Sequence, residues 1–142
     1  MLRNLRKFRA LSWRERRLLI GVALLLPWIR LALRVCGLRW TQRRLDRFVP
    51  RRPVADGLSP PAINRIVRGA SRLGSPQATC LRRSLVLWWL LKRRGVASEI
   101  RIGAYNRDGF KAHAWVEWQD GGQSDSPEAL KHLVIFERWA QT

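Results

Sequence analysis

The fold of this chain is organised around one stretch, Cys80-Leu81-Arg82-Arg83-Ser84-Leu85-Val86-Leu87-Trp88-Trp89-Leu90-Leu91-Lys92-Arg93-Arg94-Gly95. Residues 85–91 are apolar on every side of a helical wheel, which is typical of a helix buried among other elements. Cations in the last turn and a glycine beyond it are the usual end of a helix. The stretch therefore predicts a buried helix that begins near the thiol of Cys80.

Downstream of this helix the apolar pattern changes from helical to alternating. Residues 96–105 and 110–118 alternate and are bounded by Gly or Asp-Gly turns, which predicts an antiparallel hairpin. Shorter pieces at 122–125 and 133–138 are expected to add strands. Because helices come first and a small antiparallel sheet second, the predicted fold class is α+β.

Two more helical segments are predicted upstream. Residues 1–48 are basic and amphipathic, with Ser12 as a plausible N-cap and Glu15 completing a capping box. A second helix begins at Ser59-Pro60-Pro61 and ends at Gly74. The connector 49–53 has two prolines and no periodicity. We therefore predict a helical region 1–52 that packs on or beside a core formed by residues 53–142.

The formal net charge of +18 is unevenly distributed along the 142 residues. Residues 1–52 hold 15 Lys and Arg against 2 acids, a net +13, and the rest hold 13 against 8, a net +5. Such a basic half attracts anionic lipid headgroups, nucleic acid or an acidic peptide. Three tryptophans are interleaved with arginine here: Trp13, Trp28 and Trp40. This pattern is as typical of binding to a membrane or a partner protein as of packing in a core.

An apolar run at residues 18–28 resembles a signal-peptide core or a membrane span. Its uncharged stretch before Arg30 has about 11 residues, whereas a span needs roughly 20, and no small-residue cleavage site follows. Pro27 is also expected to kink a helix here. We therefore expect a core helix or a helix in the membrane interface. Because two distant cysteines form no disulfide framework, we expect a cytoplasmic protein, at most peripheral at the inner membrane face.

Cys80 is followed 33 residues later by His113, in the motif Ala112-His113-Ala114-Trp115-Val116-Glu117. Taken singly, Cys80 would be a buried structural thiol and His113 a core histidine. Taken together, they predict a nucleophile and its general base, because a helix N-terminus and an imidazole both lower the pKa of a thiol. The predicted chemistry is covalent acyl transfer. His132 lies in a polar stretch and is expected at the surface.

The base needs an acceptor that orients its ring. If the turn after the second strand is centred on residues 119–120, register places Asp125 nearly opposite His113; a turn at 120–121 places Glu128 there. The residues alone leave both open. The local carboxylates are Asp108, Asp120, Asp125 and Glu128.

Neither a metal nor a cofactor is expected. Two histidines 19 residues apart and two distant cysteines do not make a metal site without unusual geometry, and no phosphate-cradling glycine loop is present.

Four short strings occur together in the second part of the chain: Cys80-Leu81-Arg82-Arg83-Ser84-Leu85, Arg94-Gly95-Val96, Arg101-Ile102-Gly103 and Ala112-His113-Ala114-Trp115-Val116-Glu117. Together they resemble one family, the lasso-peptide leader peptidases with their transglutaminase-like, papain-like core. The similarity covers roughly residues 59–138 and implies a Cys-His-Asp triad whose acidic member lies about a dozen residues beyond the histidine, which favours Asp125 over Glu128. The chain resembles the split form of the protein, which lacks a leader-recognition domain.

The resemblance implies removal of the leader from a ribosomally made lasso-peptide precursor through a thioester. Its implied partners are the precursor peptide, a separate leader-recognition protein and an asparagine-synthetase-like lactam cyclase; no nucleic acid is expected. Backbone N–H groups at the start of the Cys80 helix would stabilise the oxyanion. Gln77 is a candidate to assist them, but its position favours an ordinary polar loop residue. Two alternatives stay open: transglutaminase-type acyl transfer on another peptide, and a non-enzymatic basic module that binds membrane or nucleic acid.

Overall fold

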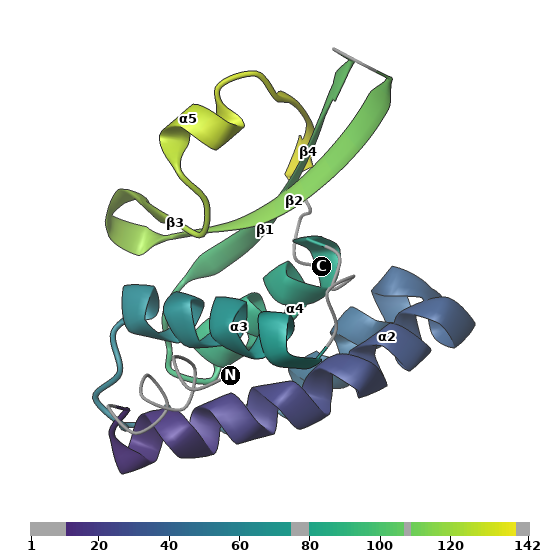
Figure 1. Ribbon diagram of the computed structural model, residues 1–142. Coiled ribbons are helices and arrows are strands. Elements are labelled where there is room, and N and C mark those ends of the chain that lie inside the picture. Colours follow the sequence, from purple (N-terminus) through teal and green to yellow (C-terminus); the bar gives the residue numbers. More distant parts are fainter. Residues whose placement is uncertain (1–10, 75–79, 107–108, 139–142) are drawn as a thin grey trace.

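Helices α2, α3 and α4 precede an antiparallel sheet in the computed structural model, which describes residues 11–74, 80–106 and 109–138 (Figure 1). This order is the predicted α+β class, and Cys80 is the first residue of α4. The elements are α2 (Trp13–Arg47), α3 (Pro60–Gly74), α4 (Cys80–Lys92), β1 (Ser98–Asn106), β2 (Phe110–Trp118), the 3-10 turn η1 (Gln119–Gly121), β3 (Gly122–Gln123), α5 (Pro127–Leu130) and β4 (Val134–Arg138).

Helix α2 begins at the predicted capping box. The Ser12 hydroxyl accepts from the backbone N–H of Glu15, and the Glu15 carboxylate accepts from the backbone N–H of Ser12 at 2.8 Å. The expected kink at Pro27 is wrong: Pro27 lies inside the helix, and the backbone departs from helical geometry at Gly37, where φ is 78°. A positive φ costs glycine little, because it has no Cβ to clash with the backbone.

The length argument against a membrane span is also wrong. Because α2 (35 residues) continues past Pro27 and Arg30 before the break at Gly37, it contains an 18-residue window apolar enough to cross a membrane by length and composition. Only 28% of that window is buried in the structure. Core helices of soluble proteins and signal sequences near an N-terminus pass the same test of length and composition.

The hydrophobic core lies where α4 packs against α2, α3 and the inner face of the sheet. Trp88 of α4 is almost fully buried, as the all-round apolar pattern of the helix predicted. The residues of α3 at three- and four-residue spacing face the same cluster. The central members are Leu19, Val22, Leu26, Ile29, Ile63, Ile66, Val67, Leu85, Leu87, Trp88, Leu91, Ile100 and Val116.

Polar contacts at the end of α4 attach the first part of the chain to this core. The indole N–H of Trp89 donates to the backbone carbonyl of Leu45 at 2.8 Å. The buried guanidinium of Arg94 pairs with Asp56 and donates to the carbonyl of Leu90. The described part of region 1–52 therefore packs directly on the rest, while the division into two regions at residue 52 stays a prediction.

The sheet has the strand order β3-β2-β1-β4, with all neighbours antiparallel. Gly103 of β1 pairs with His113 of β2, and a bulge next to Gly103 shifts the pairing with β4. A Cβ at Gly103 would lie 3.1 Å from the carbonyl oxygen of Val134 and 3.2 Å from the ring of Trp115. Glycine there allows β4 and this ring to approach β1 closely.

Candidate active site

The structure brings Cys80 and His113 together at the junction of helices and sheet. Cys80 begins α4 and is half-buried; His113 lies in β2 with 26% of its side chain exposed. The Cys80 thiol and the His113 imidazole lie close enough that each shifts the pKa of the other, and the backbone N–H of Ala114 also lowers the pKa of the thiol. The two residues, 33 positions apart in sequence, meet because α4 packs against β2.

The edge of β2 that faces away from β1 contacts β3 and the loop that carries Ser124 and Asp125. At Trp118 and Glu117 this edge pairs with β3. At Val116 the backbone carbonyl accepts from the backbone N–H of Ser124, and the backbone N–H donates to the Ser124 hydroxyl. Further along the strand, Ala114 lines the same small hollow as Cys80, Ser124 and Asp125.

Asp125 reaches the other side of the imidazole. Its Oδ2 lies 3.5 Å from Nε2 of His113, longer than the common range for a hydrogen bond but usual for an unliganded site. Neither of the expected turns produces this arrangement. The turn η1 occupies three residues, and Glu117 of β2 pairs with Gln123 of β3. If this antiparallel pairing continued, residue 127 would lie opposite His113. Pairing instead stops at Gln123, and the chain leaves the sheet with Asp125 against the ring.

Ser124 and helix α3 hold Asp125 in place, which sequence reasoning missed. The Ser124 hydroxyl accepts from the backbone N–H of Val116 and donates to Oδ2 of Asp125, both at 3.0 Å. Asn64 and Arg68 donate to the Ser124 carbonyl at 2.9 and 3.2 Å, and Arg68 lies 3.7 Å from Oδ1 of Asp125. Their four-residue spacing beside the apolar stripe of α3 was the available signal, because it places both on one side of the helix.

Opposing effects set the pKa of Cys80. Burial raises the pKa of the thiol, but the hydrogen bond with His113, the backbone N–H groups of Ala114 and Leu81, and the positive charge of His113 together lower it below its ordinary value. The N-terminal end of α4 favours the anion in the same direction. The net effect favours a thiolate, the form of cysteine that attacks carbonyl carbon.

The imidazole is shifted the opposite way. Its hydrogen bonds with Asp125 and then with Cys80 raise the pKa of His113 to about 9, with burial opposing them. The hydrogen bond with His113 lowers the pKa of Asp125, despite burial, helped by Ser124 and the charge of Arg68. His113 is therefore an imidazolium at neutral pH, and its proximity lowers the pKa of both the Cys80 thiol and the Asp125 carboxyl.

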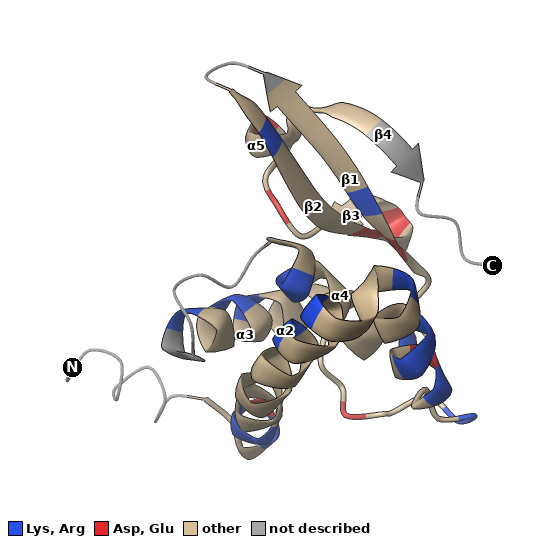
Figure 2. Ribbon diagram, turned by 90° about the vertical axis from the view of Figure 1, so that its right-hand side faces the viewer, with Lys and Arg blue, Asp and Glu red and all other residues tan. Residues whose placement is uncertain are grey.

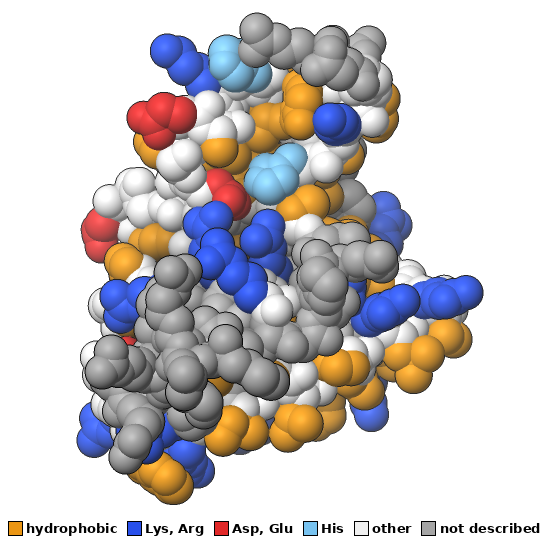
Figure 3. All heavy atoms as spheres, viewed as in Figure 1, with side chains coloured by type: hydrophobic (Ala, Val, Ile, Leu, Met, Phe, Trp, Pro, Cys, Tyr) orange, Lys and Arg blue, Asp and Glu red, His pale blue; other side chains and the backbone are white. Residues whose placement is uncertain are grey.

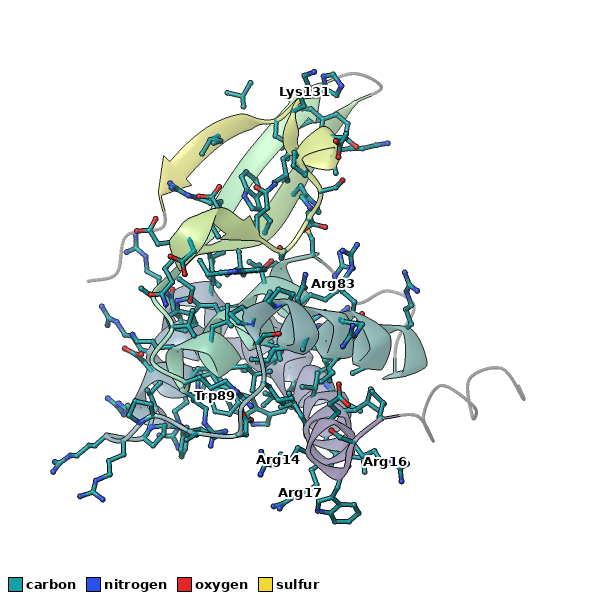
Figure 4. The ribbon with its side chains drawn as sticks, turned by 90° about the vertical axis from the view of Figure 1, so that its left-hand side faces the viewer. Arg14, Arg16, Arg17, Arg83, Trp89 and Lys131 are labelled. Atoms are coloured by element: carbon teal, nitrogen blue, oxygen red, sulfur yellow. The ribbon has the colours of Figure 1, made fainter. Side chains whose placement is uncertain are left out.

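The surroundings of the thiol are basic. A small hollow beside Cys80 is lined by side chains that include Asn64, Arg68 and Arg83. Figure 3 shows Lys and Arg side chains gathered between the sheet and the helices, and Figure 4 labels Arg83 there. A larger hollow, between the end of α4 and the β1–β2 pair, lies away from the sulfur and has no cysteine or histidine in its lining.

Other candidates lie apart from this arrangement. Glu128 is exposed in the first turn of α5, and His132 is exposed just after it. In the ranges 11–74, 80–106 and 109–138, no three His, Cys, Asp or Glu side chains come together to hold a metal ion. Within the described residues, the backbone N–H of Leu81, next to the thiol whose pKa it lowers, is a candidate donor to the oxyanion. Two residues considered above lie outside the described ranges: Gln77 and Asp108.

Alkylation of Cys80 at neutral pH is expected to depend on His113. In a Cys36→Ser background, which removes the other thiol, iodoacetamide should modify Cys80 at a pH below the thiol's ordinary pKa of 9.0. His113→Ala removes the interaction and the positive charge that lower the pKa of the thiol and leaves the burial that raises it. We therefore expect modification at pH 7 to slow and the whole pH profile to move to higher pH.

The measurement is the rate of mass gain between pH 5 and 10. His132→Ala in the same background is the matched control and should leave the profile unchanged. Equal profiles for His113→Ala and its parent would show that the two side chains do not interact in solution.

The comparisons with known proteins support a family assignment. A family model described as "Transglutaminase-like superfamily" matches residues 10–137, which is most of the chain. Neither the comparison with curated proteins nor that with solved structures found a match.

Proposed function

The chain belongs to the transglutaminase-like superfamily, and we propose that it is a cysteine peptidase that removes the leader from a ribosomally made lasso-peptide precursor. Proteins of this superfamily are typically cysteine peptidases or acyltransferases. The observation that supports the proposal is the position of His113, which interacts with the Cys80 thiol and lies 3.5 Å from the Asp125 carboxylate. The choice of substrate rests on the resemblance of the sequence strings around Cys80 and His113.

The proposed reaction has two steps. The Cys80 thiolate attacks the carbonyl carbon of the bond that joins leader to core, and the tetrahedral intermediate expels the amine of the core as the C–N bond breaks. The imidazolium of His113 gives its proton to that amine. Neutral His113 then takes a proton from water, whose oxygen attacks the thioester, and the leader leaves with a new carboxylate while the thiol is restored.

Asp125 has a positioning role in this scheme. Its carboxylate accepts from one ring nitrogen of His113, so the other nitrogen is directed at the sulfur. Ser124, Asn64 and Arg68 hold the loop that carries Asp125. This second layer makes the orientation of the ring depend on the packing of α3 against the sheet.

The proposed setting follows from the product. A leader peptidase of the split form acts with a separate leader-recognition protein, and a lactam cyclase consumes the amine that it releases. Both proteins are partners that we propose from the resemblance, as is a cytoplasmic location, where the precursor is made.

The test is incubation of the full chain with a leader-bearing precursor, with and without the recognition protein, followed by mass spectrometry. Two products whose masses sum to precursor plus one water are the expected result. A product in which the leader is joined to an added primary amine would instead identify an acyltransferase. An uncut precursor in the presence of the recognition protein would overturn the peptidase proposal.

Asp125→Asn is expected to slow cleavage by about 10- to 1000-fold and to move its pH profile. With Asp125 present, the imidazolium is lost as pH rises through about 9, so kcat/KM should fall there. Asparagine removes the largest cause that raises the pKa of His113, so this alkaline fall should shift to lower pH. Initial rates between pH 6 and 10 measure both effects.

Glu128→Gln is the matched control, because it makes the same chemical change on an exposed carboxylate of α5. Its profile should coincide with that of the unaltered protein. If Glu128→Gln moves the alkaline limb and Asp125→Asn does not, Glu128 is the acidic partner in solution.

A further inference from the structure

One face of α2 is apolar and exposed along the first two-thirds of the helix. Leu24 is 73% exposed and Leu31 61% exposed. At roughly 100° per residue, the exposed apolar side chains fall within an arc of about 80°, and they span about 33 Å at 1.5 Å per residue. We call this surface the outer stripe; it consists of Trp13, Ile20, Leu24, Trp28, Leu31 and Val35.

Arginines accompany the outer stripe on the same helix. Figure 4 shows Arg14, Arg16 and Arg17 projecting around the N-terminal end of α2, where Arg17 falls within the arc. Exposed Arg30 and Arg34 flank the stripe further along. In Figure 2 the basic residues concentrate on the helices, and the sheet carries few.

Carboxylates are turned away from this surface. Within the described span of α2 the acids are Glu15, which bonds to Ser12 and lies 3.7 Å from Arg65, and Asp46, which pairs with Lys92 at 2.6 Å. The stripe therefore offers apolar area with a basic border. That combination complements a partner surface whose outer layer is anionic and whose underlying layer is apolar.

We propose that the outer stripe docks α2 lengthwise on the surface of an anionic lipid bilayer. Leucine, isoleucine and valine would enter the boundary between headgroups and acyl chains, tryptophans would lie at headgroup level, and arginines would reach the phosphates. A protein partner would need a long apolar groove edged with acids to match the same surface. An anionic membrane supplies both the apolar contact and the negative charge along the whole length of the stripe, without a shaped pocket.

The packing of α2 decides between lying on the bilayer and crossing it. The face opposite the outer stripe is buried against α3 and α4 through Leu19, Val22, Leu26 and Ile29. A span would expose that core and carry Arg30 and Arg34 into hydrocarbon, which is costly for a charged side chain. A helix that keeps its inner face in the protein and its outer face in the interface avoids both costs.

Docking in this orientation leaves the candidate active site accessible. In Figures 1 and 3, α2 and its hydrophobic side chains run along the border of the molecule opposite the sheet, with α3 and α4 between them. The junction that holds Cys80 and His113 therefore faces away from the docked surface. The docking proposal does not depend on the reaction proposed for that site.

The test is co-sedimentation of the full chain with preformed vesicles of phosphatidylcholine alone or with about one-third phosphatidylglycerol. We expect binding to the anionic vesicles that weakens at 0.5 M NaCl, since salt screens the arginines. Leu24→Gln with Leu31→Gln should weaken this binding at least tenfold. Val134→Gln with Ile135→Gln is the matched control, two exposed apolar residues of β4 changed in the same way, and should bind as the parent does.

Circular dichroism checks that each variant folds, and Leu24→Ala with Leu31→Ala replaces the glutamine pair if that pair does not. No binding to anionic vesicles, equal binding by the stripe variant, or equal binding to both vesicle types would overturn the proposal. A dimer in light scattering that the stripe variant converts to monomer would also overturn it, in favour of a second copy of the chain.

Discussion

Cys80→Ala is expected to abolish cleavage of the precursor, whereas Cys36→Ala leaves it unchanged. Alanine removes the only sulfur in contact with His113 among the described residues, so no thioester forms. Loss of a covalent nucleophile typically lowers kcat by 10³-fold or more, roughly 10⁶-fold in the best-studied cases. The initial rate of product formation, followed by mass spectrometry, should fall below detection.

Cys36 provides a stringent control because it is the other cysteine of the chain, is exposed and lies in α2. Both alanine variants should show the far-ultraviolet circular dichroism of the parent. Continued cleavage by folded Cys80→Ala would exclude thioester chemistry. Unchanged biological activity of that variant, together with loss on charge reversal at Arg43, Arg44 and Arg47, would favour a non-enzymatic basic module.

His113→Ala is expected to lower kcat by about 10³-fold or more, because one residue serves as proton donor, proton acceptor and counter-charge for the thiolate. The loss should not add to that of Cys80→Ala, since the two act as a unit. Single-turnover measurement of precursor cleavage separates this loss from any change in binding.

His132→Ala is the matched variant, with the same change at the exposed histidine after α5, and should retain the rate of the parent. Comparable losses in both variants would point to a general effect on folding. A loss confined to His132→Ala would place the base elsewhere and separate the thiol from its proposed partner.

The loop after β3 shows where local pattern stops being informative. Alternation predicted β2 and a short strand beyond it, and both exist. The position of Asp125 depended on the turn, and the structure contains neither expected turn but η1, with Asp120 at a positive φ of 68°. Asp125 then lies against His113 because Asn64 and Arg68 of α3 hold the Ser124 carbonyl, contacts 60 and 56 residues apart that no local rule predicts.

For helix α2, too, the sequence predicts the residue types, and the packing determines which of them are exposed. Its apolar and basic residues were evident from the sequence, as was the capping box at Ser12. An apolar residue on such a helix could equally belong to a core or to an interface. The tertiary structure assigned Leu26 to the core and Leu24 to the surface, because only one side of α2 meets α3 and α4.

The order of elements, the helix that begins at Cys80 and the strand that carries His113 could all be predicted from the chain alone, because hydrophobic period, capping and turn residues act over a few neighbouring positions. The folded molecule was needed to show that Asp125 meets the imidazole, that Ser124 and Arg68 hold it, and that one face of α2 remains exposed. These depend on how elements far apart in the chain pack together, and packing is a property of the folded molecule as a whole.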